Sequence, residues 1–277
     1  LKNLSGIPWV ADFRDPFPVY NVPSLDRNKS GQYIDQVTSN FADRLVFTTE
    51  QTALLYKKRY PHIDTNKVRV VENGFNEDVF NNFNGVEIGE SVDEGQIRSG
   101  YSGWIYSEGR SPEKLFKALS RYNQLVTEKK TISLIFRGVE KTAEFGLQID
   151  KLGISNLVHF MPSINYESSI REMLQADALL LLQGKIFNNQ IPGKAYEYLR
   201  AGKPILTFTD IGSATGNMMK EIDHAIVADI ENENCIFEAL CKLLLIKVSK
   251  SFDYKQYSRR HRTEQLVQVL NEIDVQV

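Results

Sequence analysis

Short apolar runs alternate along this chain with segments in which apolar residues recur every three or four positions. The runs are rich in β-branched residues and are bounded by glycine or proline, which is typical of buried strands, whereas the spaced pattern is typical of helices. In the first eighty residues, the pattern predicts strands at 7–13, 45–48 and 68–71 and helices at 32–42 and 50–59. Such alternation of strand and helix favours a parallel sheet.

The alternation restarts after residue 96 and continues almost to the end of the chain. Segment 81–96 is rich in Asn, Gly, Glu and Asp and has no periodicity, so we interpret it as an interdomain linker. The strands expected beyond it are 97–103, 131–136, 157–160, 178–182, 204–207 and 225–228. The helices expected beyond it are 112–126, 142–152, 166–175, 193–201, 214–222, 231–246 and 257–273. This series predicts an α/β fold in which a complete Rossmann-like domain, 97–250, follows the C-terminal part of a second one, 1–80.

Composition narrows the class of protein. A length of 277 residues suits about two domains, and 42% hydrophobic with 25% charged residues is typical of globular proteins. The 33 Lys and Arg against 35 Asp and Glu give a net charge of −2, which argues against nucleic-acid binding. Cys235 and Cys241 form neither a disulfide framework nor a zinc motif, and no apolar run is long enough to span a bilayer. We therefore expect a cytoplasmic protein and, because the chain starts at Leu1 instead of Met, a piece of a longer one.

Ligands of open α/β sheets bind at the carboxyl ends of the strands, so we expect the site residues in the loops that follow the strands. In the loop after strand 97–103, Gly103 and Gly109 allow close backbone approach, and Arg110 supplies a fork of donors. The helix that opens at Pro112 adds a positive dipole end, so the loop suits a phosphate. A surface loop whose glycines only shape a turn is the alternative. Neither G-x-G-x-x-G nor G-x-x-x-x-G-K-[ST] occurs there, which removes the usual support for dehydrogenases and P-loop ATPases.

The loop before helix 193–201 is the second candidate. Lys194 and Glu197 are three residues apart and share one helix face. A cation in the first turn opposes the helix dipole unless an anion lies there, and a carboxylate one turn deeper can accept bonds from sugar hydroxyls. An ordinary surface ion pair is the alternative.

Two further loops carry charges or glycine at a strand end. Arg137 and Gly138 follow strand 131–136, where a simple turn explains them equally well. Asp12, Arg14 and Asp15 follow the first strand directly. Because unpaired burial of charge is costly, we expect these three to face a cleft, with a self-contained turn network as the alternative.

Taken in order, four segments resemble glycosyltransferase family 4, whose GT-B fold has two Rossmann domains. They are IPWVADFRDPF at 7–17, VVENGFNEDVF at 70–80, SGWIYSEGRSPEKLFKAL at 102–119 and IPGKAYEYLRAGKPIL at 191–206. The resemblance covers nearly the whole chain. It implies transfer of a sugar from a nucleotide-diphosphate donor with retention of configuration, and a C-terminal segment, 251–277, whose helix crosses back to the leading domain.

The resemblance also implies roles for residues on the donor side. Glu197 matches the second glutamate of the family's paired motif, which holds the donor ribose, and Asn189 occupies the place of the first. Arg110 matches the basic residue on the diphosphate, whereas Trp104 replaces its usual arginine partner, whose charge Lys194 is expected to supply. We expect Arg110, Lys194 and Asn189 to act in catalysis. The residues expected to bind the donor are Gly103, Trp104, Arg110, Arg137, Gly138, Ile191, Pro192, Gly193, Lys194 and Glu197.

On the acceptor side, Arg14 falls where many family members have a histidine, and Asp12 and Asp15 are expected to orient the acceptor. The donor would be a UDP-, GDP- or ADP-sugar, and the acceptor a glycan or lipid-linked glycan in surface-polysaccharide assembly, with peripheral association at the inner face of the membrane. No Asp-x-Asp motif occurs, so we expect no metal and no cofactor other than the donor substrate.

Two other functions remain open. One is another GT-B enzyme, such as a nucleotide-sugar epimerase or a phosphorylase, and the other is a non-catalytic nucleotide-sugar-binding module. Because the leading domain lacks its early strands, we expect the chain to bind nucleotide but to be inactive in transfer by itself.

Overall fold

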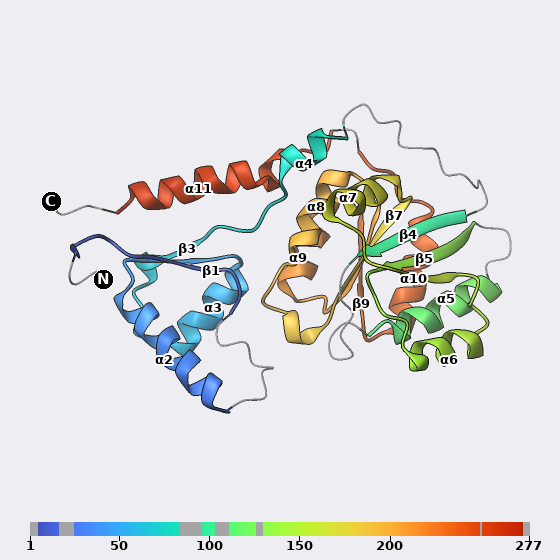
Figure 1. Ribbon diagram of the computed structural model, residues 1–277, viewed down its shortest axis with the longest axis horizontal. Coiled ribbons are helices and arrows are strands. Elements are labelled where there is room, and N and C mark those ends of the chain that lie inside the picture. Colours follow the sequence, from blue (N-terminus) through green and yellow to red (C-terminus); the bar gives the residue numbers. More distant parts are fainter. Residues whose placement is uncertain are drawn as a thin grey trace.

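Two parallel β-sheets with flanking helices make up the computed structural model, which describes residues 5–16, 25–83, 96–102, 111–125, 130–249 and 251–273 (Figure 1). The smaller sheet has the order β1-β2-β3, with strands β1 (Val10–Phe13), β2 (Arg44–Phe47) and β3 (Val68–Val70). The larger has the order β6-β5-β4-β7-β8-β9. Its strands are β4 (Gln96–Ser102), β5 (Thr131–Arg137), β6 (Val158–Met161), β7 (Ala178–Gln183), β8 (Ile205–Thr209) and β9 (Ala225–Asp229). The α/β fold class expected from the sequence is confirmed.

The helices follow the strands in the alternation that the sequence predicts. They are α2 (Leu25–Phe41), α3 (Glu50–Arg59), α4 (Glu77–Asn81), α5 (Glu113–Leu125), α6 (Ala143–Lys151), α7 (Tyr166–Gln175), α8 (Gly193–Ala201), α9 (Ala214–Lys220), α10 (Glu233–Leu243) and α11 (Arg259–Asn271). Short 3-10 turns lie at Thr65–Lys67, Lys185–Phe187 and Lys255–Tyr257. Helix α4 is an addition, since the sequence pattern predicts no helix between 71 and 81.

Residue alternation explains how the larger sheet is covered on both faces. Leu134 and Phe136 of β5 point into a core shared with α5, α6 and α10. Leu179 and Leu181 of β7 point into a second core shared with α7, α8 and α9. Strand β7 is therefore buried throughout, which agrees with its continuous apolar run.

The smaller sheet also has two covered faces. Leu45 and Phe47 pack with Ala42, which follows α2, and with α3, whereas Val46 packs with Val71 and with Val269 of α11. Helix α11 thus lies along the smaller sheet although it follows the larger domain in sequence (Figure 1).

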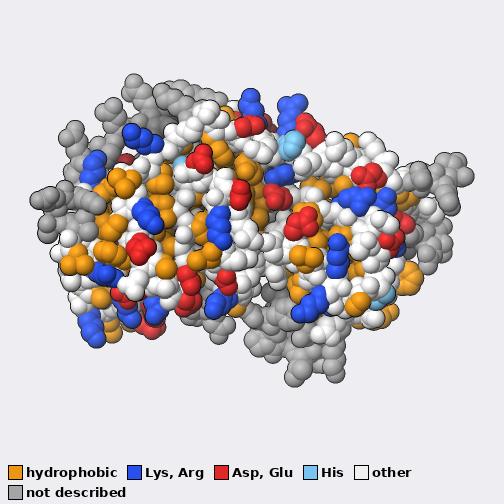
Figure 2. Space-filling view, turned by 180° about the vertical axis from the view of Figure 1, so that it is seen from behind, with side chains coloured by type: hydrophobic (Ala, Val, Ile, Leu, Met, Phe, Trp, Pro, Cys, Tyr) orange, Lys and Arg blue, Asp and Glu red, His pale blue; other side chains and the backbone are white. Residues whose placement is uncertain are grey.

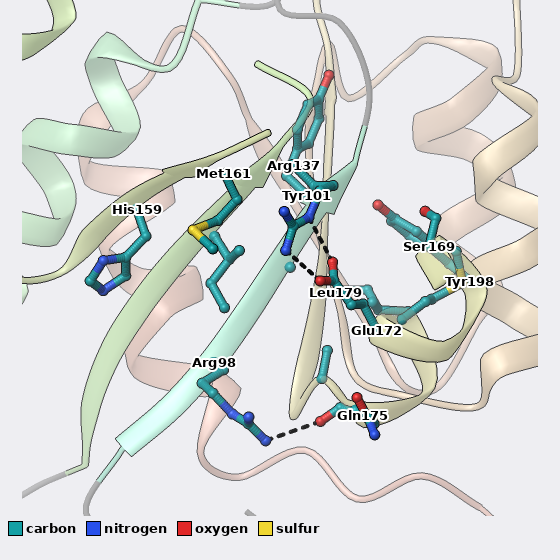
Figure 3. A pocket seen from close by; sticks show the side chains of 14 residues that line it. Arg98, Tyr101, Arg137, His159, Met161, Ser169, Glu172, Gln175, Leu179 and Tyr198 are labelled. Atoms are coloured by element: carbon teal, nitrogen blue, oxygen red, sulfur yellow. Dashed lines mark hydrogen bonds and ion pairs between the residues drawn. The ribbon is translucent and has the colours of Figure 1, made fainter. Parts of the chain in front are cut away.

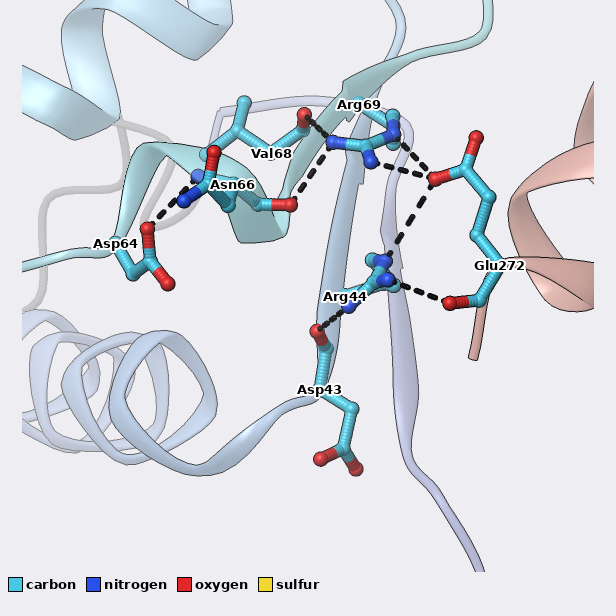
Figure 4. A network of polar contacts seen from close by, with 7 residues as sticks. All are labelled: Asp43, Arg44, Asp64, Asn66, Val68, Arg69 and Glu272. Carbon is cyan, nitrogen blue, oxygen red and sulfur yellow. Dashed lines mark hydrogen bonds and ion pairs between the residues drawn. The ribbon is translucent and has the colours of Figure 1, made fainter. Parts of the chain in front are cut away.

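Charged side chains hold the C-terminal end of α11 against the smaller sheet. The Glu272 carboxylate accepts hydrogen bonds from Arg69 at 2.9 and 2.5 Å, and the Glu272 carbonyl accepts one from Arg44 at 2.9 Å (Figure 4).

The chain crosses between the two sheets twice, and the crossings run side by side. The Phe75 amide donates to the Tyr257 carbonyl at 3.1 Å, and the Arg259 amide donates to the Phe75 carbonyl at 2.8 Å. Gly74 lies within this contact, where a Cβ would be 2.7 Å from the Tyr257 carbonyl oxygen. The absence of a side chain at Gly74 therefore allows the crossings to pair.

Candidate functional site

The strand order of the larger sheet reverses between β4 and β7. In open α/β sheets, ligands bind beside the carboxyl ends of the strands at such a switch point. The loop after β7 leads to α8, so the structure places the segment 188–197 at this edge.

The N-terminus of α8 is open. Pro192 occupies the N-cap position without a side-chain hydrogen bond to the helix, and Gly193 is exposed with no atom within 4 Å of a Cβ built on it. Ile191 is buried and anchors the preceding loop. Unsatisfied amides at a helix start favour an anion, so this end of α8 suits a phosphate or a sugar oxygen.

The loop before α8 is held by the smaller domain. The carbonyl oxygen of Asn189 accepts hydrogen bonds from the hydroxyls of Thr49 and Thr52 at 2.5 and 2.8 Å. The Gln190 amide group donates to the Asp15 carboxylate at 2.8 Å. These contacts join the predicted donor loop to the predicted acceptor side.

Glu197 lies one turn into α8 and is partly buried. Its carboxylate accepts a hydrogen bond of 2.7 Å from the Tyr166 hydroxyl at the start of α7. Burial raises the pKa of Glu197 above its ordinary value, while Tyr166, Arg259 and Lys194 act in the opposite direction. Burial and the bond to Glu197 raise the pKa of Tyr166 to about 12, so the phenol remains protonated and donates. A carboxylate has several lone pairs, so Glu197 retains capacity to accept bonds from ligand hydroxyls.

Lys194, in the first turn of α8, turns toward β4. Its ammonium nitrogen lies 4.2 Å from the centre of the Tyr101 ring, within the range of a cation–π contact. The ring holds a positive charge near the end of β4, from which the loop with Gly103, Trp104 and Arg110 departs. Those three residues lie outside the described part of the chain.

Arg137 and Gly138 lie at the end of β5. The Arg137 guanidinium forms an ion pair with Glu172 of α7, and also donates to the Pro162 carbonyl at 2.8 Å. Gly138 has φ +73°, which favours glycine, and its amide donates to the Met161 carbonyl at 2.9 Å. The Arg137 side chain thus has partners in α7 and in the segment after β6.

The same ion pair borders a cavity of about 380 Å³ between α7 and strands β4 to β6 (Figure 3). Its lining includes Arg98, His159, Met161 and Leu179. The lining also includes Tyr101, whose ring contacts Lys194, so this cavity adjoins the start of α8.

Of the three charged residues expected to face a cleft, Asp12 lies in β1, and Arg14 and Asp15 follow this strand. Arg14 forms an ion pair of 2.7 Å with Asp12 and donates to the Asn73 side-chain oxygen at 3.2 Å. Asp15 instead reaches Gln190 of the larger domain. The local ion pair therefore joins Arg14 to Asp12, whereas Asp15 makes the contact with the larger domain.

Several contacts at the site were not predicted from the sequence. Thr49, Thr52 and Tyr166 carry no recognisable chemical motif, and each meets its partner only through folding. Arg259 stands at the start of α11 close enough to Glu197 to lower its pKa. Within the described residues, no cluster of His, Cys, Asp and Glu is suited to hold a metal, and no helix is long and apolar enough to cross a membrane.

On the face seen in Figure 2, basic and acidic side chains are interspersed over the surface. This distribution agrees with the net charge of −2 and gives no broad basic field on that face.

No family model and no curated protein sequence matches the chain. Among solved structures, it is similar to Alr3699/HepE from Anabaena in complex with UDP and glucose, with 13% identity, a TM-score of 0.67, and coverage of 98% of this chain and 73% of that protein. It is also similar to sucrose-phosphate synthase from Thermosynechococcus elongatus, at 12% identity and a TM-score of 0.63, covering 96% of this chain and 68% of that one. A third similar structure is WaaG, a glycosyltransferase involved in lipopolysaccharide biosynthesis, at 16% identity and a TM-score of 0.62, covering 97% and 72%. These similarities show the fold, and the GT-B-like architecture expected from the sequence is confirmed.

Proposed function

We propose that this chain belongs to a glycosyltransferase that uses a nucleotide-diphosphate sugar and binds the donor at the start of α8. The observation that carries the proposal is the uncapped N-terminus of α8 at the strand-order reversal, flanked by Lys194 and Glu197. The open helix end suits phosphate, and Glu197, held by Tyr166, suits the ribose hydroxyls. The complexes of Alr3699/HepE with UDP and UDP-glucose support a nucleotide-sugar donor on this fold.

In the proposed reaction, an acceptor hydroxyl attacks the anomeric carbon while the bond to the nucleotide diphosphate breaks. The leaving phosphate takes the acceptor's proton, and the new glycosidic bond forms with retention. Arg110, Lys194 and the helix end stabilise the charge that develops on the phosphate, at about 3 kcal/mol per donor. Asn189 lies beside the donor sugar, and the segment from Ile191 to Gly193 supports it.

We further propose that the acceptor is a glycan or lipid-linked glycan bound on the side of Asp12, Arg14 and Asp15. Those residues lie in and directly after β1, at the junction with the donor loop, where Asp15 already contacts Gln190. Surface-polysaccharide assembly is the setting that we propose, and no metal is required.

Calorimetry with UDP, GDP and ADP tests the donor site. We expect one nucleotide to bind equally well with and without EDTA, and Glu197→Gln to weaken it. Glu144→Gln, at an exposed carboxylate in the first turn of α6, is the matched control. No binding of any of the three nucleotides, or equal affinity in both variants, would contradict the site. Incubation of the protein with donor alone tests the reaction, because an epimer formed without acceptor would indicate an epimerase.

A further inference from the structure

A second cavity, of about 350 Å³, lies where the smaller sheet meets α11. Arg14 from the end of β1, the segment 71–74 after β3, and one face of α11 line it. The α11 residues include Arg259, Arg262 and Thr263. Three guanidinium groups therefore line one small space, and Glu72 is the carboxylate among the lining residues.

Two of the three guanidinium groups have carboxylate partners. Arg262 donates to Glu72 at 2.6 Å and to the Asn73 carbonyl at 3.4 Å, and its side chain is only 14% exposed. Arg14 pairs with Asp12, and its side chain is 55% exposed. Arg262 is thus fixed in the wall, whereas Arg14 is accessible at the cavity.

The positive charge of Arg259 is not balanced by an ion pair within the described residues. Its Nε donates to the Gly74 carbonyl at 3.1 Å, a neutral acceptor. Within the described residues, no carboxylate lies at ion-pair distance from its guanidinium group, although Glu197 is near enough for a longer-range interaction. The backbone of Arg259 is held at the paired crossings, so the position of this charge is set by the fold.

The other charged residues in the first turn of α11 have the same sign as Arg259. The first turn of α11 holds Arg259, Arg260, His261 and Arg262 and no acidic residue. Arg260 pairs with Glu264 at 3.9 Å on the exposed side. Cations at a helix N-terminus are unfavourable by some tenths of a kcal/mol each, and a bound anion reverses that effect.

We propose that this cavity binds a phosphate group of the acceptor, with Arg14 and Arg259 as its ligands. A guanidinium group matches phosphate oxygens with two parallel hydrogen bonds, and two such groups from different elements fix its orientation. This inference rests on the proposed function, because only a transferase has an acceptor to which the phosphate can belong. The nearness of Arg259 to Glu197 and Tyr166 puts the acceptor's anchor beside the proposed donor site.

Titration with sn-glycerol 3-phosphate in the presence of saturating UDP tests the inference, with glycerol as the uncharged control. UDP fills the donor site, so binding detected by phosphorus NMR then reports a separate site. We expect the phosphate ester to bind, glycerol not to bind, and Arg259→Gln and Arg14→Gln each to weaken the ester at least fivefold. Arg260→Gln removes the same charge at the adjacent exposed position, which does not line the cavity, and should leave binding unchanged.

The outcomes separate this inference from the donor proposal. Displacement of the ester by UDP, or equal binding to the Arg259 and Arg260 variants, would overturn the acceptor site while leaving nucleotide binding intact. Failure of UDP to bind, with the ester still bound, would overturn the assignment to an acceptor together with the proposed function. Because Arg259→Gln also removes the bond to the Gly74 carbonyl, Arg14→Gln provides an independent readout, since Arg14 bonds to the Asn73 side chain there and its substitution removes no bond between the crossings.

Discussion

Gly74→Ala is expected to disrupt the pairing of the two crossings. The added Cβ would lie 2.7 Å from the Tyr257 carbonyl oxygen and 2.8 Å from both the Arg259 amide nitrogen and the Ser258 carbonyl carbon. Ordinary contact begins near 3.4 Å, so the backbones must separate by about 0.7 Å. Gly74 does not have a positive φ, and the cost is therefore one of space.

The magnitude follows from two sources. Overpacking of this kind costs about 1–3 kcal/mol. The Phe75–Tyr257 and Arg259–Phe75 hydrogen bonds, at 3.1 and 2.8 Å, are each worth roughly 0.5–1.5 kcal/mol and are stretched by the same movement. We expect a loss of about 2–4 kcal/mol in the free energy of unfolding, which corresponds to a fall of several degrees in Tm.

Urea unfolding and calorimetry measure this loss, and hydrogen exchange locates it at 73–76 and 257–260. Gly100→Ala is the control, because the atom nearest to its Cβ is the Ala176 Cβ at 3.7 Å, an ordinary contact. Equal unfolding midpoints for the two variants would refute the steric reasoning.

Three further predictions concern single side chains. Glu197→Gln should weaken UDP binding about 5- to 150-fold. Because burial raises the pKa of Glu197, the variant should also be more stable than the original protein near pH 7, and this gain should disappear in acid. A stability difference that stays constant across pH would contradict this. Burial lowers the pKa of His224, so the folded protein should lose stability as pH falls below about 6.5. His224→Leu should remove that part of the loss, measured by urea unfolding at pH 5 and 7.5. An equal loss of stability between the two pH values with and without the substitution would show that His224 contributes nothing. Glu272→Ala should lower the free energy of unfolding by less than about 1 kcal/mol, since its partners Arg44 and Arg69 are partly exposed. Amide exchange in the last turn of α11 should become faster. Unchanged exchange would show that the ion pairs do not hold the helix end.

Local signals explain why much of the fold is predictable from the sequence. Helices α7 and α8 have the expected bounds because their ends are set locally: the Asn165 side chain caps α7, and Gly202 ends α8 with φ +62°. The predicted strand at 7–13 is shorter in the structure because only Val10–Phe13 has ladder partners on β2.

The site is less predictable because its contacts join distant parts of the chain. Tyr166 and Glu197 are 31 residues apart, and Thr49 and Asn189 are 140 apart. No periodicity encodes such pairs. Arg137 is a further example, since the sequence spacing does not reveal that Glu172 is its partner.

The contacts of the donor loop with Thr49, Thr52 and Asp15 have a kinetic consequence. Hydrogen bonds that exchange with water are worth about 1 kcal/mol each, so releasing these three costs only a few kcal/mol. A state with the loop released is then populated at roughly 0.1–10% and reached within microseconds to milliseconds. The paired crossings at Phe75 and Tyr257 are continuous with both domains and need not break in that motion. Release of the donor loop from the smaller domain therefore requires no unfolding of either domain.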